Sequence, residues 1–351
     1  MKAGFVRLTV ALCGIALVQS HAVAQAAQAE STNTLDVVVT DKLDKPVADL
    51  KPEDFKVIDN RVERPITSVK LVTPGDQKSD PPVTAYLVVD MVNTVSEAIS
   101  CDRALKEFLR QAGPRLAVPT SLIFFTDTTV RFQREPTRDP KVLLANLANA
   151  HVQGTSRSIL GMGGVAQFRG RVEKSLQAMT HIAMKLNEVK GRKLILWIGP
   201  GWAAFPFPAV LNSDRALDQL FKYIVDFSTA LRQVRITVYF VDTFGAVPDL
   251  LEPGRTTLYL QFTKGVGSPK QADDGDLMVQ VIAAQTGGRV LFNSNDISGL
   301  IDKCLSDAQA FYVVTYSAPH ASHANEFHAV EVKVDKPGLT TRARMGYYAQ
   351  P

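Results

Sequence analysis

The chain has 351 residues, of which 46% are hydrophobic, and a formal net charge of +4 at pH 7. This apolar fraction is typical of globular proteins and the length corresponds to about two domains, so disorder over the whole chain is excluded. Lys and Arg form no cluster of the kind that binds phosphate backbones, and we therefore expect no nucleic-acid partner.

Residues 1–26 show the three parts of a cleavable secretory signal. Lys2 and Arg7 give a positive start, an apolar stretch follows over 8–18, and Ala22-Val23-Ala24 offers small residues for cleavage. The apolar stretch is shorter than the roughly 20 residues of a membrane-spanning helix, and no later stretch approaches that length. We expect a periplasmic or secreted protein without a transmembrane segment in its mature chain. Its charge would be nearly neutral, with 39 − 2 = 37 basic residues against 35 acidic ones.

After the signal the pattern is first that of a small β unit. Short strand-like runs lie at 35–39, 55–58 and 66–72, separated by polar turns, and predict an N-terminal β segment over 33–74. Turn-forming and charged residues over 75–82 predict a linker.

From residue 83 onward apolar runs alternate with segments of helical period, which predicts an α/β fold with a doubly wound, mostly parallel sheet over 83–318. Near-continuous apolar runs predict strands buried on both faces at 83–89, 120–125, 193–198 and 235–241, with weaker candidates at 289–292 and 311–316. Helices are predicted at 97–112, 140–150, 171–189, 214–234, 276–286 and 298–310.

Residues 128–133 predict a short antiparallel edge strand. Two β runs, at 327–334 and 341–348, end the chain. We expect this C-terminal β segment, 319–349, to pack with residues 33–74 as a small β side domain.

Ligands of open parallel sheets bind at the carboxyl ends of the strands, so the residues that follow each strand are the candidates for a site. Asp90 ends the run that begins at Val83, and Asp242 ends the run over 235–241. Gly199-Pro200-Gly201 follows the run over 193–198.

With these features and its flanking β segments, nearly the whole mature chain resembles the von Willebrand factor type A-related domain proteins common in acidobacteria. The stretch from Val39-Thr40-Asp41 to Val57 is similar to the N-terminal signature of that family, and Phe327-His328 to Tyr347-Tyr348 is similar to its C-terminal one. Asp44-Lys45 stands where the family has a glycine turn. The resemblance implies a von Willebrand factor A or Rossmann-like core.

The resemblance also implies a metal-ion-dependent adhesion site, in which an Asp-x-Ser-x-Ser loop, a Thr and a third-loop Asp hold Mg²⁺. Here Asp90 matches, Val92 replaces the first Ser and Thr94 stands for the second, while a glycine, Gly199 or Gly201, occupies the third-loop region. The site is therefore degenerate. Its remaining candidate ligands, which could hold a hard cation only weakly, are Asp90, Thr94, Thr155 and Asp242. The alternative is that Asp90 accepts backbone N–H bonds, as buried carboxylates do. No cofactor other than this weakly held Mg²⁺ is expected.

Three aromatic residues after the same strand, Trp202, Phe205 and Phe207, predict a partner-binding surface, since aromatic anchors dominate many interfaces. The alternative is that these rings cover the edge of the sheet as part of the core. The spacing of His320, His323, Glu326 and His328 suits a transition metal, with a solvated turn as the alternative.

The two cysteines of the mature chain, Cys101 and Cys304, fall in different predicted helices, and a disulfide between them is not favoured. The motifs of serine hydrolases, zinc peptidases, phosphate-binding loops and dithiol oxidoreductases are all absent from the sequence.

These patterns together predict an exported, non-enzymatic protein-binding or adhesion module that presents its strand-end loops to a protein or cell-envelope partner. One alternative is a metal-dependent periplasmic hydrolase that uses Asp90 and Asp242. The other is a structural envelope component with a vestigial site.

Overall fold

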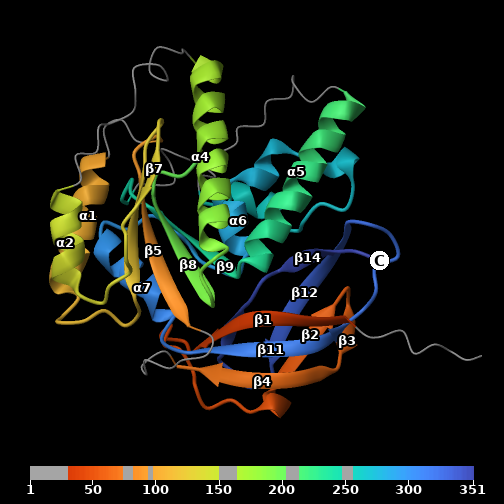
Figure 1. Ribbon diagram of the computed structural model, residues 1–351. Coiled ribbons are helices and arrows are strands. Elements are labelled where there is room, and N and C mark those ends of the chain that lie inside the picture. Colours follow the sequence, from red (N-terminus) through yellow and green to blue (C-terminus); the bar gives the residue numbers. More distant parts are fainter. Residues whose placement is uncertain (1–30, 74–81, 94–97, 150–163, 203–212, 247–255) are drawn as a thin grey trace, which may run out of the picture.

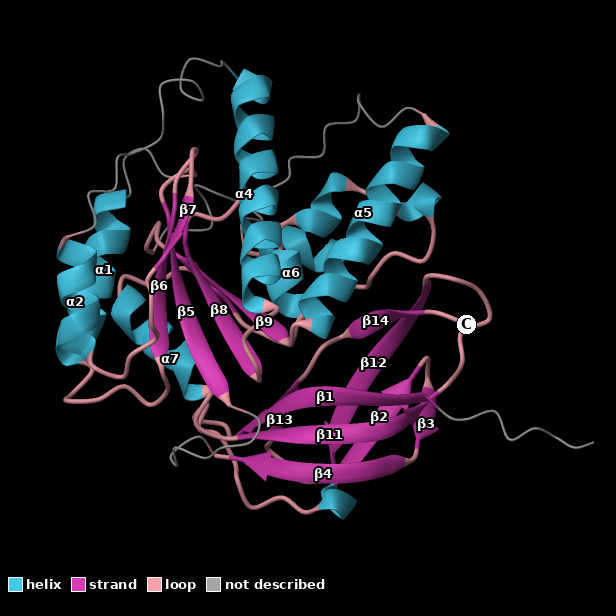
Figure 2. Cartoon of the chain, in the orientation of Figure 1, coloured by secondary structure: helices cyan, strands magenta, loops and turns pink. Residues whose placement is uncertain are grey.

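The computed structural model describes residues 31–73, 82–93, 98–149, 164–202, 213–246 and 256–351. Within these ranges the protein is a mixed α/β structure, in which a six-stranded, mostly parallel sheet with helices on both faces adjoins two four-stranded antiparallel sheets (Figure 1, Figure 2). No helix of the described ranges is long and apolar enough to cross a membrane. The predicted signal and residues 75–81 of the predicted linker lie outside these ranges.

The parallel sheet has the strand order β10-β9-β8-β5-β6-β7. Its strands are β5 (Val83–Asp90), β6 (Thr120–Phe125), β7 (Val130–Phe132), β8 (Arg192–Gly199), β9 (Ile236–Asp242) and β10 (Val290–Leu291). Only β7 runs antiparallel, at the edge beside β6. Every residue of the four longer strands is buried. The near-continuous apolar runs of the sequence are therefore explained by helical cover on both faces, and the predicted parallel sheet is confirmed.

Helices cover the sheet in two layers, one on each face. One layer contains α4 (Gly164–Leu186), α5 (Asp214–Gln233) and α6 (Val279–Gln285). The other contains α1 (Ala98–Gln111), α2 (Pro140–Ala148) and α7 (Ile297–Ser306). α4 begins at Gly164, before the predicted start at Arg171. Gly164 and Gly170 have low helix propensity, so the sequence gives only a weak helical signal in this first part of the helix.

The antiparallel sheets combine strands from both ends of the chain. One has the order β13-β1-β11-β4 and the other β14-β12-β2-β3. Their strands are β1 (Ser31–Thr40), β2 (Phe55–Asp59), β3 (Val62–Arg64), β4 (Ile66–Val72), β11 (Phe311–Ala318), β12 (Glu326–Val334), β13 (Thr340–Arg342) and β14 (Gly346–Ala349). Apolar side chains from both sheets form a separate core.

The place of β11 differs from the prediction, which put residues 311–316 in the parallel sheet. β11 instead pairs antiparallel with β1 on one side and β4 on the other, so that Val314 lies opposite Leu35 and Val69. An apolar run indicates a buried strand but does not indicate which sheet buries it.

The turn after β1, which is closed by an antiparallel bridge between Thr40 and Pro46, shows why an Asp fits at position 44, where a glycine was expected. Asp44 has a φ of 63°, a conformation that Asp adopts more readily than most residues. The carboxylate of Asp41 supports the turn by accepting the backbone N–H groups of Leu43 and Lys45. The Asp44 carboxylate faces the helical layer and pairs with Arg289 at 3.0 Å and with Lys303.

Candidate functional site

Asp90, the last residue of β5, is buried, and its carboxylate accepts four hydrogen bonds from groups in the described part of the chain. Oδ1 accepts the backbone N–H groups of Val92 at 2.9 Å and Asn93 at 3.0 Å. Oδ2 accepts the Asn93 side-chain amide at 2.6 Å and the Trp197 indole N–H at 2.9 Å. Burial raises the pKa of Asp90, and these hydrogen bonds oppose that rise. Asp90 therefore stabilises the loop after β5 and joins it to β8, as the alternative interpretation of the sequence had it.

Gly199 lies directly against Asp90. A Cβ atom at position 199 would lie only 2.9 Å from the Cβ of Asp90, closer than real Cβ atoms approach. A third-loop carboxylate at this position is therefore incompatible with the observed position of Asp90. The glycine that replaces it is required by packing.

Asp242 ends β9 and is also buried, and its Oδ1 accepts the backbone N–H of Phe244 at 3.1 Å. In the sheet β8 separates it from Asp90, so their backbones are two strand widths apart, about 10 Å. Thr94 and Thr155, the other predicted ligands, lie outside the described residues. Within the described part of the chain, His, Cys, Asp and Glu form no group of three that could hold a metal ion.

Trp202 is in the core rather than on a contact surface. Its side chain is 1% exposed, its indole N–H donates to the carbonyl of Leu277 at 2.8 Å, and its ring meets that of Trp197 edge-on at 4.4 Å. The ring is buried because it fills the space between β8 and the segment before α6. Phe205 and Phe207 lie outside the described residues.

A polar hollow of about 380 Å³ lies at the same carboxyl edge, next to the end of β6. One wall is the turn of residues 126–129, which contains three threonines and Asp127, and the other is α4, which contributes Lys174, Gln177 and His181. Lys174 and Gln177 are exposed to solvent. Sequence reasoning missed this hollow, because the polar side of α4 has the pattern of any solvated helix face.

The predicted histidine cluster is divided between a turn and a buried network. His328 is buried in the antiparallel sheets, where its Nδ1 lies 2.8 Å from the Asp59 carboxylate. The hydroxyls of Tyr316 and Tyr347 donate to the same carboxylate, both at 2.9 Å. His323 lies instead in the exposed turn after β11. His328 therefore belongs to a hydrogen-bonded network that includes strands of both antiparallel sheets.

Cys101 and Cys304 are free and buried. Burial raises the pKa of both thiols, which makes thiolate chemistry at either position unfavourable.

No protein-family model matches the chain, and no curated protein matches it significantly. Among solved structures, manganese-loaded TRAP protein of Plasmodium vivax aligns with 79% of this chain and 96% of its own, at 11% identity and a TM-score of 0.29. Human COPII-coat protein Sec24c aligns over 80% of this chain and 44% of its own, at 10% identity and a TM-score of 0.31. The three N-terminal domains of the type V pili tip protein Mfa5 from Porphyromonas gingivalis align over 57% of this chain and 34% of their own, at 17% identity and a TM-score of 0.22. Similarities this distant assign neither a family nor a function.

Proposed function

We propose that the chain is an exported, non-enzymatic binding module that presents the carboxyl edge of its parallel sheet to a protein partner. The observation that carries this proposal is the polar hollow between the 126–129 turn and α4, because it is an accessible concave surface at the edge where open parallel sheets bind ligands. The secretory signal predicted from the sequence and the resemblance to von Willebrand factor type A-related proteins support the same function.

The hollow contains one Lys, Lys174, and one carboxylate, Asp127, together with the hydroxyl donors of the threonines in the turn. Because Lys174 is exposed and Asp127 is buried, the accessible side chain at this position favours an acidic group on the partner segment. Beneath the edge, the hydrogen bonds of Asp90 fix the end of β5 relative to β8. A rigid base of this kind reduces the loss of conformational entropy on binding.

The alternative of a metal-dependent hydrolase requires Asp90 to contact an ion or a substrate. Both carboxylate oxygens of Asp90 already accept two hydrogen bonds each, so an ion would have to displace protein donors. Hydrolysis of ester, phosphate or peptide substrates that disappears in Asp90→Asn would contradict the binding proposal.

The mature protein, residues 27–351, would be used to capture partners from envelope extract, and their affinities would then be measured for two matched variants. Lys174→Glu places a negative charge in the hollow, whereas Lys190→Glu makes the same change at an exposed position beyond the other end of α4. We expect Lys174→Glu to weaken binding about tenfold and Lys190→Glu to leave it unchanged. Equal affinities of the two variants would show that the partner binds elsewhere.

A further inference from the structure

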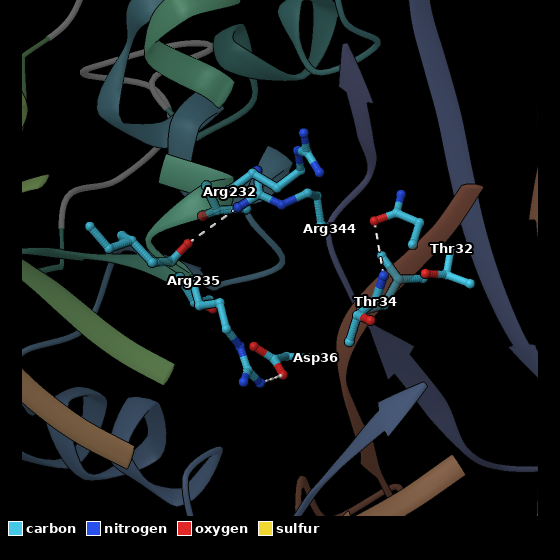
Figure 3. Close-up of a pocket in the computed structure, with 11 residues that line it drawn as sticks. Thr32, Thr34, Asp36, Arg232, Arg235 and Arg344 are labelled. Carbon is cyan, nitrogen blue, oxygen red and sulfur yellow. Dashed lines mark hydrogen bonds and ion pairs between the residues drawn. The ribbon is translucent and has the colours of Figure 1, made fainter. Parts of the chain in front are cut away.

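A second concave site lies at the opposite, amino edge of the parallel sheet, where β9 adjoins β1 of the antiparallel sheets (Figure 3). It has a volume of about 370 Å³. Its walls come from β1, the carboxyl end of α5, the start of β9 and the segment that precedes β14. The charged residues that line it are Asp36, Arg232, Arg235 and Arg344.

Positive charge in this pocket exceeds negative charge. Asp36 pairs with Arg235, whose Nη2 lies 2.5 Å from its Oδ1, and lies 4.0 Å from the Nε of Arg192. Among the described residues, no carboxylate lies within ion-pair distance of Arg232 or Arg344. Figure 3 shows these two side chains next to each other, apart from the Arg235–Asp36 pair.

The contacts of Arg232 and Arg344 hold their positions but leave most of their donors unused. Arg344 donates one hydrogen bond, from Nη2 to the carbonyl of Ile236 at 3.4 Å. The guanidinium of Arg232 lies over the ring of Tyr347, 5.7 Å from its centroid, and its Nε is buried without an acceptor among the described residues. Each guanidinium has five N–H donors, so both can bind a further acceptor.

The pKa of Arg344 is lowered to about 10, mainly by burial and to a smaller extent by the charge of Arg232. Arg344 therefore remains protonated at neutral pH, and two guanidinium groups, which are charged in proteins, lie next to each other in a partly buried space. The carboxyl end of α5 compensates only partly, because a helix end is equivalent to about half a negative charge. An anion between the two guanidinium groups would balance the remainder.

We propose that this pocket binds a small oxyanion, a phosphate or carboxylate group, between the guanidinium groups of Arg232 and Arg344. Planar guanidinium groups match the geometry of these anions with paired N–H donors. The hydroxyl-bearing side chain of Thr32 lies on the β1 wall of the pocket and is exposed. The site is separate from the protein-binding edge, so that this inference does not depend on the proposed function.

Calorimetric titration of the mature protein with inorganic phosphate and with citrate, at constant ionic strength, tests the proposal and distinguishes the two oxyanions. We expect saturable binding of at least one of them, while chloride at the same ionic strength gives no saturable heat. Arg232→Gln and Arg344→Gln should each weaken binding about tenfold or more, as expected for lost charge-assisted hydrogen bonds. Arg215→Gln, at an exposed position in the first turn of α5, is the matched control and should bind as the wild type does.

Arg344→Lys addresses the case in which a glutamine variant does not fold. It keeps the charge but loses the planar fork, so we expect a folded protein with weaker, still measurable binding. Two results would overturn the proposal: neither phosphate nor citrate binds saturably, or Arg344→Gln folds and binds both anions with wild-type affinity.

Discussion

Two arginine pairs lie where the parallel sheet and its helices meet the antiparallel sheets, and they differ in what neutralises them. Arg289 and Arg342 share the carboxylate of Asp307, which is fully buried, at 2.9 Å and 2.6 Å. Arg232 and Arg344 have no such carboxylate among the described residues. This boundary therefore accommodates partly or fully buried guanidinium groups by two routes. One pair is neutralised by the chain itself, whereas the other requires an anion from solution.

The balanced pair also connects the two ends of the described chain. Arg289 reaches Asp44 in the turn after β1, and Arg342 comes from β13. Burial opposes ionisation of Asp44, but hydrogen bonds from Lys303 and Arg289 outweigh it and lower the pKa of this carboxyl. An acid at the turn position therefore has a role that a glycine could not perform.

The largest expected effect comes from breaking the balanced pair. Asp307→Asn removes the charge that Arg289 and Arg342 share, and we expect it to lower the free energy of unfolding by about 3–5 kcal/mol, as for other broken buried ion pairs. Urea unfolding of residues 27–351 measures this change. Asp226→Asn is the control, since it breaks an exposed pair with Lys222 on α5 and should change stability by under about 0.5 kcal/mol. Equal effects would mean that the Asp307 cluster is not a stabilising link.

Asp276 is an acidic side chain for which burial disfavours the charged form, as it does for Arg344. It lies in the short helix Asp274–Leu277, is buried, and accepts a hydrogen bond from the backbone N–H of Asp273 at 2.9 Å. Burial raises its pKa from 3.8 to about 6. Because the folded state then binds a proton that the unfolded state has released, stability should fall as pH rises from about 4 to about 6.

Asp276→Asn removes this titration and keeps a side-chain acceptor. At pH 7 we expect the variant to be more stable than the wild type by up to about 3 kcal/mol, and at pH 3 the two should agree. Thermal unfolding across this pH range measures the difference. A constant difference at all pH values would indicate that the carboxyl does not titrate in this window.

A matched substitution at two nearby positions tests the comparison of the arginine pairs directly. Arg342→Met removes a partner of buried Asp307, and should lower the free energy of unfolding by about 1.5–3 kcal/mol. Arg344→Met removes a charge that repels Arg232, so in buffer without phosphate or citrate it should be neutral or slightly stabilising. Similar losses from both variants would show that the contacts of Arg344 within the protein outweigh its repulsion from Arg232, and would remove the reason to expect an anion.

The sheet could be predicted from the sequence because strands buried on both faces leave a local signature. The runs that became β5, β6, β8 and β9 are apolar at nearly every position. β11 has the same local signature, and its membership in the other sheet depends on pairing with β1, which lies more than 250 residues away. Local pattern carries no information about such a partner.

The candidate sites were less predictable for the same reason. Asp90 could be located because it ends a recognisable strand, but its hydrogen bonds depend on the packing of Asn93 and Trp197. Arg232 and Arg344 are unremarkable in sequence and more than 100 residues apart. Their meeting results from the topology that brings the segment before β14 next to α5. Only the fold could reveal that they have no carboxylate partner within the described residues.

The smallest effect is expected at the carboxyl edge, on addition of Mg²⁺, Mn²⁺ or Ca²⁺ to residues 27–351. A ligand present at 100 times its dissociation constant stabilises a protein by about 2.7 kcal/mol, which thermal unfolding resolves easily. We expect no such shift and no saturable heat, because both Asp90 oxygens are occupied by protein donors and Gly199 supplies no second carboxylate. Saturable heat that persists in Asp226→Asn but is lost in Asp90→Asn would contradict this expectation. A cation would then displace the hydrogen-bond donors of Asp90 at the carboxyl edge, just as an anion is proposed to bind Arg232 and Arg344 at the amino edge. The charged groups at both edges of the sheet would be neutralised by ions from solution.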